Sequence, residues 1–506
     1  MNVILILCDT LRRDHCGPYH GGRPLSQVTG DGQPDWVVPT PNIDRLAERG
    51  TVFENAYCGS HPCMPARRDI YTGRLEFLWR GWGPLEDDDL DLPRQVSGPP
   101  NQSLSRASVK VSYLVTDHFH LWEQGAGNYH MGYSGFEFIR GMEADAYLTD
   151  PVDFPLPSAR YRNQKVERHF RNVELTRRRP DGSLDESKWF SAQTFSKAAE
   201  WIDRNHTRKD FFLHIDSFPP HEPWDPPERF VKMFDPRGYD VNEYFPSAPY
   251  RPVDESGLTA DQVRHVQALY AASVVHVDEC LGMLLDALDR HDLWKNTLVI
   301  FTSDHGTFNG ARGRLGKMQT HLFDPIAHIP LIVAHPECGH GERRSQLVQL
   351  VDLYPTILRA CGAPIPEGIH GVDLAEAIAD PSAKTRERAL YGVFGQGISM
   401  TDGRWVLHQA PKPENEPLYW YSYHQAKFLR YDLGEYEPEG RRAVRHRPYG
   451  DPTWLSDRSV DPNEEVNLAG SHPDQLRRMQ RQLAEELDRL GAPPEHKARL
   501  GLGESE

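Results

Sequence analysis

The sequence predicts an α/β protein built on a large, mostly parallel β-sheet with helices on both faces. Short runs of Val, Ile, Leu and Phe alternate along the chain with amphipathic helical stretches, a pattern typical of strands that are buried on both faces. Charged residues follow directly after several of these runs, at the sheet edge where ligands collect. At 506 residues, the chain exceeds what one hydrophobic core supports, so we expect a second, smaller domain.

The predicted elements follow one another in strand and helix order. We expect strands at 3–7, 109–115, 211–215 and 297–302, and helices at 41–49, 191–205 and 259–291. After about residue 380 the strands become shorter, with a hairpin turn at 401–403 and a helix over 473–490 that carries Leu and Met at three-to-four spacing. We therefore predict a large domain over residues 1–380 and a smaller C-terminal α+β domain over 381–506.

Composition narrows the classes of function. The 57 basic and 73 acidic residues give a net charge of −16, which argues against nucleic acid or an anionic membrane as partner. The apolar start lacks the basic flank and the length of a signal peptide, and other apolar runs are shorter than the roughly 20 residues that span a bilayer. Seven cysteines, an odd number, favour reduced thiols over a disulfide framework. We expect a soluble, cytoplasmic protein, and homo-oligomerisation stays open.

The most informative segment is Cys63-Met64-Pro65-Ala66-Arg67, continued by Thr72-Gly73. It resembles the C-x-P-x-R signature by which sulfatases present a cysteine to the formylglycine-generating enzyme. In that family the cysteine is oxidised to an aldehyde, whose hydrate attacks sulfur and later expels sulfate by re-forming the carbonyl. Arg67 would place a permanent cation near the anion. A cysteine alone is more often a small core residue, so the other segments decide.

Further segments resemble the sulfatase family in the same order along the chain. They are Asp9 after the first strand, Thr40 to Leu46, Phe53 to Tyr57, Pro220-His221-Glu222-Pro223-Trp224, Ser303 to Gly306, Gly316-Lys317, Val351 to Thr356 and Asp461 to Leu468. The resemblance extends from the first strand to about residue 470. It implies an alkaline-phosphatase-like fold, maturation by the formylglycine-generating enzyme, and a small sulfated substrate.

The resemblance also implies a divalent metal bound by Asp9, Thr10, Asp304, His305 and the oxidised Cys63. These donors are mostly hard oxygen ligands, so Ca²⁺ is favoured, with Mn²⁺ and Mg²⁺ as alternatives. Many sulfatases have two aspartates where this chain has Asp9-Thr10, and Thr10 either ligates through its hydroxyl or caps the next helix. Asp304-His305 replaces the common Asp-Asn pair, and histidine there is seen in choline-sulfatase-like members and in phosphonate monoester hydrolases.

Two residues gain a catalytic role from the resemblance. His221 would lie on the leaving-group side, and Lys317 would bind sulfate. The family's G-K-W-H segment is missing, and Thr116-Asp117-His118-Phe119-His120 stands in its place. We expect His118 to replace the catalytic lysine or histidine as a proton donor, with His120 as the weaker candidate. His321, downstream of Lys317, is a further candidate, although lone histidines are usually structural.

These features predict a sulfuric ester hydrolase that cleaves sulfate monoesters through a formylglycine diol at residue 63 and a divalent metal. The main alternative is a phosphonate monoester hydrolase or phosphodiesterase of the same superfamily, because sulfuryl and phosphoryl centres are both tetrahedral and anionic. An inactive binding protein on this scaffold is the alternative from another class, and the joint presence of the six catalytic and metal residues argues against it. The substrate stays open, and we expect loops 21–36, 78–100, 118–145 and 222–258 to wall the pocket.

Overall fold

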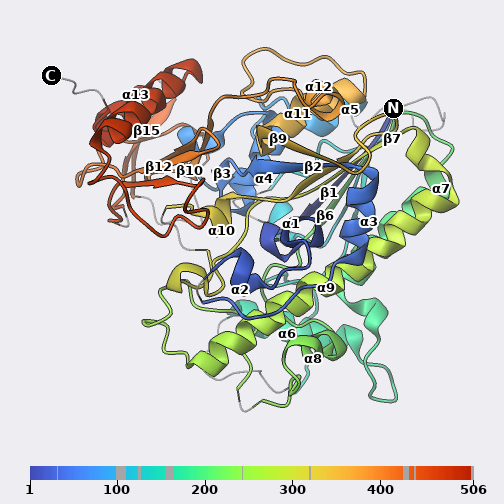
Figure 1. The fold of residues 1–506 in the computed structure, drawn as a ribbon. Coiled ribbons are helices and arrows are strands. Elements are labelled where there is room, and N and C mark those ends of the chain that lie inside the picture. Colours follow the sequence, from blue (N-terminus) through green and yellow to red (C-terminus); the bar gives the residue numbers. More distant parts are fainter. Residues whose placement is uncertain are drawn as a thin grey trace.

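The structure, a computed structural model, describes residues 1–30, 32–98, 110–123, 127–154, 164–241, 243–317, 321–424, 432–437, 440–448 and 450–502. Helices cover both faces of a large sheet, and a smaller unit built on a second sheet carries the C-terminal part of the chain (Figure 1). Val109 of the predicted second strand lies outside the described residues, as do residues 31, 99–100, 124–126 and 242 of the predicted pocket loops.

The large sheet is mostly parallel, as predicted. Its strand order is β5-β4-β6-β1-β7-β8-β2-β9. The strands are β1 (Asn2–Cys8), β2 (Thr51–Tyr57), β4 (Ser112–Thr116), β5 (Gly135–Phe138), β6 (Phe212–Ser217), β7 (Thr297–Ser303), β8 (Leu331–Ala334) and β9 (Glu342–Gln349). β1 pairs in parallel with both β6 and β7, whereas β8 runs antiparallel to its two neighbours. The carboxyl ends of β6, β1 and β7 therefore meet at one edge.

Each face of the sheet packs against its own layer of helices. Along β1, Ile4, Ile6 and Cys8 belong to one hydrophobic core and Val3, Leu5 and Leu7 to the other, as alternation along a strand requires. The first core includes α3 (Pro41–Arg49), α7 (Phe190–Asn205) and α9 (Ala260–Arg290), and the second includes α4 (Cys63–Thr72), α5 (Leu92–Ser97) and α11 (Leu353–Ala360) (Figure 1). All ten residues of α4 are buried.

The long helix α9 is apolar because it lies in the core. By length and composition α9 could cross a membrane, but 89% of its most apolar 18-residue stretch is buried inside the protein. Its start is specified locally, since Thr259 and Gln262 form a capping box. The predicted helix over 259–291 is confirmed within one residue at each end. The predicted strand over 211–215 continues two residues further in β6, and this extension reaches the functional site.

The smaller unit contains a five-stranded sheet in the order β16-β12-β11-β10-β3. Its strands are β3 (Ser60–His61), β10 (Ala389–Val393), β11 (Ile398–Thr401), β12 (Trp405–Gln409) and β16 (Trp454–Asp457), and α13 (Pro473–Arg489) and α14 (Glu495–Leu500) pack against it. The predicted hairpin is confirmed by the antiparallel pairing of β11 and β12. β3 comes from far upstream and pairs in parallel with β10. The domain boundary near residue 380 stays a prediction.

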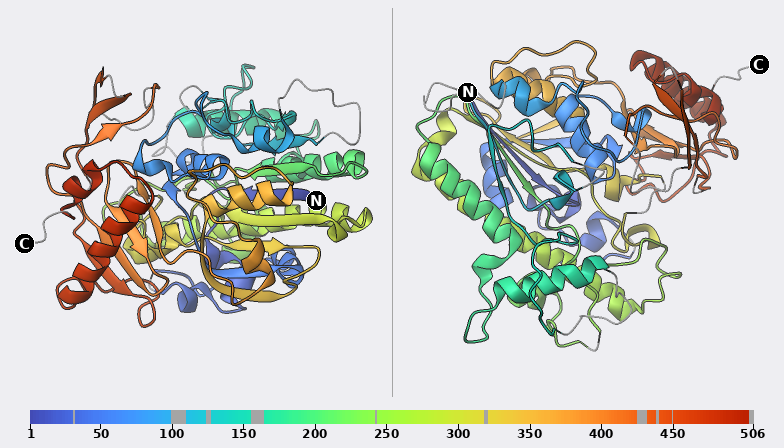
Figure 2. Two further views of the ribbon diagram at one scale, coloured as in Figure 1. Left: turned by 90° about the horizontal axis from the view of Figure 1, so that it is seen from above. Right: turned by 180° about the vertical axis from the view of Figure 1, so that it is seen from behind.

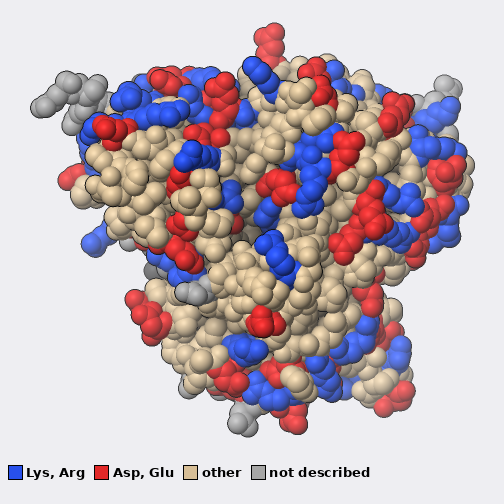
Figure 3. Space-filling view, viewed as in Figure 1, with Lys and Arg blue, Asp and Glu red and all other residues tan. Residues whose placement is uncertain are grey.

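The remaining elements surround these two sheets. A third sheet of β13 (Tyr419–Trp420), β15 (Arg441–Arg445) and β14 (Asp432–Glu437) belongs to the C-terminal part. The other helices are α1 (Gly17–His20), α2 (Leu25–Val28), α6 (Gln164–Arg177), α8 (Glu228–Phe234), α10 (Asp324–Ala327) and α12 (Ala375–Ala379). Seen from above, the C-terminal unit lies at one end of the molecule (Figure 2). Basic and acidic side chains are interspersed on the face shown in Figure 3.

Candidate active site

Three buried aspartates meet at the carboxyl edge of the central strands. Asp9 follows β1, Asp304 follows β7, and Asp216 lies near the end of β6, opposite Leu7 in register. All three are fully buried. The sequence predicted Asp9 and Asp304. It missed Asp216 because the expected strand ended at residue 215, although an acidic residue at the end of a third buried strand was an available signal.

Arg67 joins these three carboxylates from one turn inside α4. Its Nε and Nη2 donate to the two oxygens of Asp216 at 2.8 and 2.6 Å. Its Nη1 donates to Asp304 Oδ2 at 2.8 Å and lies 3.0 Å from Asp9 Oδ2. Such a fork geometry fixes carboxylates in position. Arg67 thus contacts three of the protein's own carboxylates and, through Nη1, the backbone carbonyl of Cys63 at 3.2 Å, and one guanidinium leaves the combined charge of the carboxylates negative.

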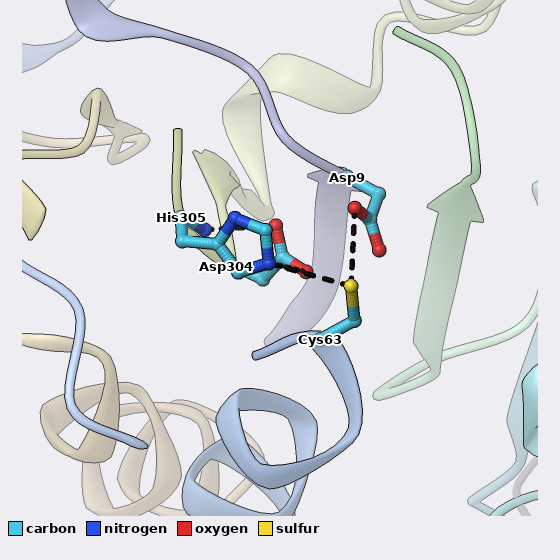
Figure 4. Close-up of side chains that lie close together, drawn as sticks. All are labelled: Asp9, Cys63, Asp304 and His305. Atoms are coloured by element: carbon cyan, nitrogen blue, oxygen red, sulfur yellow. Dashed lines mark hydrogen bonds and ion pairs between the residues drawn. The ribbon is translucent and has the colours of Figure 1, made fainter. Parts of the chain in front are cut away.

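Cys63 begins α4, and its side chain points toward the carboxylates (Figure 4). Its Sγ lies 3.5 Å from Asp9 Oδ1 and 3.3 Å from His305 Nε2. The candidate ligand atoms of Asp9, Cys63, Asp304 and His305 all lie within 4.8 Å of one another. Within the described part of the chain, no other group of three or more His, Cys, Asp and Glu side chains converges in this way. The structure thus places the candidate ligand atoms of four of the five predicted metal residues close to one another.

The chemistry of this donor set fits a metal ion. His305 Nδ1 lies 2.9 Å from the carbonyl of Gly306, so this hydrogen bond assigns the proton to Nδ1 and leaves the Nε2 lone pair facing the cluster. Burial and the charge of Asp9 raise the pKa of Asp304 well above its usual range. Burial acts on Asp9 in the same direction, but Arg67, His221 and His118 hold its pKa well below the usual range. A divalent cation would remove the repulsion between the two carboxylates.

Thr10 lies beside this cluster in an unusual backbone conformation. Its φ is 64°, a left-handed value that β-branched residues rarely adopt and that is found at functional sites. Its N–H donates to Asp304 Oδ1 at 2.9 Å, and its hydroxyl donates to Asp9 Oδ1 at 2.6 Å. The next helical turn begins at Arg13 with Arg12 as its N-cap. Of the two alternatives predicted for Thr10, helix capping is therefore wrong.

The candidate histidines occupy different environments. His118 Nε2 lies 3.0 Å from Asp9 Oδ2, and burial and the charge of Arg67 lower the pKa of His118 to about 4. His118 is therefore a neutral hydrogen-bond partner of Asp9. His120 lies 2.6 Å from Glu123 and 3.3 Å from Glu143. His321 Nε2 lies 2.7 Å from the carbonyl of Pro452 in the C-terminal part. The contacts of His120 and His321 are thus with groups outside the carboxylate cluster.

Lys317 and His221 approach the cluster from another side and share a neighbour. Lys317 Nζ lies 3.3 Å from Thr10 Oγ1 and 3.4 Å from Glu222 Oε2. His221 Nδ1 donates to the backbone carbonyl of Glu222 and lies 3.5 Å from its Oε2. Glu222 had no predicted role, although an acidic residue directly after the motif histidine was visible in the sequence. The site is thus a buried anionic cluster flanked by a lysine and a histidine.

Comparisons with known proteins agree with this geometry. A sequence model of the family described as Sulfatase matches residues 1–363. Arylsulfatase K of Xenopus laevis is 24% identical over 96% of this chain and 82% of its own length. The choline-sulfatase of Rhizobium meliloti is 24% identical over 82% and 79%. The solved structure of a phosphonate monoester hydrolase from Silicibacter pomeroyi has a TM-score of 0.61 at 18% identity, covering 96% and 95%, a likeness that concerns the fold.

The mostly parallel sheet with helices on both faces and a smaller C-terminal sheet is the alkaline-phosphatase-like fold, as predicted. Because the family match spans well over half of its residues, this chain belongs to the sulfatase family. It is a sulfuric ester hydrolase, and the prediction of an enzyme is confirmed.

Proposed function

We propose that this chain hydrolyses small sulfate monoesters with a formylglycine made from Cys63 and a divalent metal held by Asp9, Asp304 and His305. The observation that carries the proposal is the position of Cys63 at the start of α4, with Sγ 3.5 Å from Asp9 and 3.3 Å from His305. Formylglycine would supply a hydrated aldehyde as nucleophile, and the bound ion would supply a Lewis acid that holds a sulfate oxygen.

The chain's own residues then have separate tasks. Arg67 holds Asp9, Asp216 and Asp304 in position, so it acts on the geometry of the ligands. Lys317, 3.3 Å from Thr10 Oγ1, places a positive charge beside the cluster and stabilises charge on a non-bridging sulfate oxygen. His221 provides the proton for the leaving oxygen. His118, hydrogen-bonded to Asp9, orients that carboxylate, and this assignment replaces the proton donor expected at position 118.

The proposed metal is Ca²⁺, because two carboxylates and oxygen donors suit a hard ion, and His305 makes Mn²⁺ the principal alternative. Chelation should abolish turnover of nitrophenyl sulfate, and Asp304→Asn should lose both the bound metal and the rise in thermal stability that added metal produces. Elemental analysis, activity and melting temperature are measured together. Asp89→Asn, a carboxylate far from these ligands in sequence, is the control that keeps its metal. Active enzyme without a divalent metal would contradict the site.

A phosphonate monoester or phosphodiester substrate is the second candidate, and His305 favours it. This histidine, 3.3 Å from Cys63 Sγ, occupies the position at which the sequence resembles phosphonate monoester hydrolases. Relative kcat/KM for nitrophenyl sulfate and a nitrophenyl phosphonate decides between the two. We expect the sulfate ester to be preferred, and a reversed preference would assign the chain to phosphorus chemistry.

We also propose maturation by a formylglycine-generating enzyme and a cytoplasmic location. All seven cysteines are free thiols, and six of them are buried, which suits a reducing compartment. Co-expression with the maturation enzyme followed by intact-mass analysis of the Cys63 peptide tests the modification. Fractionation of the native cells tests the location, and recovery from an oxidising compartment would contradict it.

A further inference from the structure

Glu222 lies between the two groups that approach the carboxylate cluster from outside. Its Oε2 is 3.4 Å from Lys317 Nζ and 3.5 Å from His221 Nδ1. Its backbone carbonyl accepts a hydrogen bond from the same His221 nitrogen. The residue is buried, with 8% of its surface exposed, so its interaction with the Lys317 ammonium, and with His221 when that ring is protonated, is weakly screened. One carboxylate therefore contacts both Lys317 and His221.

The position of the Glu222 carboxylate is itself fixed. The Tyr250 hydroxyl donates to Oε1, and the Tyr250 ring packs against Gly316, where a Cβ atom would lie 2.1 Å from the ring. The backbone directly after Tyr250 is paired with the segment before Lys317, through Leu315 N–H to Arg251 O at 3.0 Å and Val253 N–H to Gly313 O at 2.8 Å. Tyr250, Glu222 and Lys317 therefore form one connected assembly in which Gly316 is required by close approach.

The hydrogen bond of His221 to the Glu222 carbonyl has a consequence for its proton. Nδ1 carries a hydrogen in this arrangement, so His221 can donate a proton from Nε2 only as the doubly protonated imidazolium. The pKa of His221 lies below its usual value because burial outweighs the nearby charges, of which Glu222 raises it, Lys317 lowers it, and Asp9 and Glu143 raise it. His221 also lines a small cavity with Arg177, Asp225 and His276, in which Asp225 is paired with Arg177 at 2.5 Å and with His169 at 3.0 Å.

We propose that Glu222 is a positioning residue that keeps His221 in its proton-donating form and holds the ammonium of Lys317 at the cluster. The inference rests on the proposed function, since it assigns these two residues their roles in ester cleavage. Glu222 itself does not contact the reacting atoms in this scheme. Its removal should therefore change how cleavage depends on pH and on the leaving group, beyond any loss of stability.

The test uses Glu222→Gln, which keeps the shape of the side chain and removes its charge, in matured and metal-loaded enzyme. An opposite charge at this distance shifts a pKa by about 1–3 units, so we expect the basic limb of kcat/KM for an alkyl sulfate to move to lower pH by about one unit. The loss at neutral pH should be about tenfold larger for the alkyl sulfate than for nitrophenyl sulfate. When His221 is already replaced by alanine, adding Glu222→Gln should not further change the ratio of the rates for alkyl sulfate and nitrophenyl sulfate, because Glu222 acts on that ratio through His221.

A second readout does not depend on turnover. Titration of ¹³C-labelled histidine by NMR, with the His221 signal assigned from His221→Gln, should give a lower His221 pKa in Glu222→Gln than in the parent protein. Glu76→Gln, another buried glutamate, is the matched control and should leave the His221 titration unchanged. An unaltered His221 pKa in Glu222→Gln overturns the proposal. A wild-type enzyme that cleaves no sulfate ester, with the His221 shift intact, overturns only the proposed function.

Discussion

Arg67 and Arg68 are neighbours on α4, yet they serve two different buried charge clusters. Arg67 contacts Asp9, Asp216 and Asp304, each at the end of a different strand. Arg68 points the other way, to Glu76, Asp89 and the carbonyl of Pro84. Arg67 and Arg68 are both almost completely buried, with 0% and 1% of their surface exposed. Their surroundings differ in charge balance, and that difference separates a functional cluster from a structural one.

The structural cluster has a smaller excess of negative charge than the functional one. Two arginines, Arg68 and Arg80, face Glu76, Glu86 and Asp89. Burial alone would raise the pKa of Glu76, but these arginines lower it to about 2. At the carboxylate cluster one arginine faces three aspartates, and the pKa of Asp304 is raised by burial and by Asp9. The larger excess of buried negative charge makes the carboxylate cluster a place for an external cation, whereas the more nearly balanced cluster supports the fold.

The largest expected effect comes from removing the side chain that α4 presents to the carboxylate cluster. Cys63→Ala should lower kcat for nitrophenyl sulfate by more than about 10⁴-fold, because the nucleophile is lost. The melting temperature should change little, since the deleted atom is small. Cys58→Ala is the control, because it removes a fully buried thiol nearby in sequence and should keep its activity. Substantial turnover by purified Cys63→Ala enzyme would mean that the carboxylate cluster beside Cys63 is not the catalytic site.

Exchanging the two arginines for lysine tests the comparison directly. Arg67→Lys loses the bidentate contact with Asp216 and should lower activity or metal affinity by about 10–100-fold. Arg68→Lys should instead cost about 1–3 kcal/mol of stability while the activity per folded molecule is retained. Steady-state kinetics, metal content and denaturant unfolding are measured on both variants. If Arg68→Lys loses as much activity as Arg67→Lys at unchanged stability, the two clusters do not differ as described.

The smallest effect on activity is expected at Glu76 in the structural cluster, whose contribution to stability depends on pH. The folded-state pKa of Glu76, about 2, lies below the unfolded value of about 4.3, so its contribution to stability is present above pH 4.3 and is lost as pH falls toward 2. It is at most about 3 kcal/mol. Wild-type protein should therefore exceed Glu76→Gln in unfolding free energy at neutral pH, and the gap should narrow below pH 4.5. A gap that is constant with pH would mean that Glu76 contributes by shape alone.

Local patterns were sufficient for much of the fold and for part of the site. The helix over 41–49 and the strands that precede Asp9 and Asp304 are specified by periodicity and by neighbouring residues, so the sequence predicted them. The pairing of β3 with β10 joins residues 60–61 to 392–393, and nothing local marks so short a strand. The same limit applies to Glu222, whose contact with Lys317 depends on how the 313–317 segment folds back. Periodicity and local motifs do not predict the long-range contacts of single residues.

The complete burial of α4 sets an order of events. Every residue from Cys63 to Thr72 is packed inside the protein, so another enzyme can touch the cysteine only while this helix is still free of its neighbours. The proposed oxidation then has to compete in time with the final packing of the chain. A molecule whose helix docks first would keep an ordinary thiol until it unfolds locally. The fraction of active protein in a cell would thus depend on the relative rates of folding and of cysteine modification.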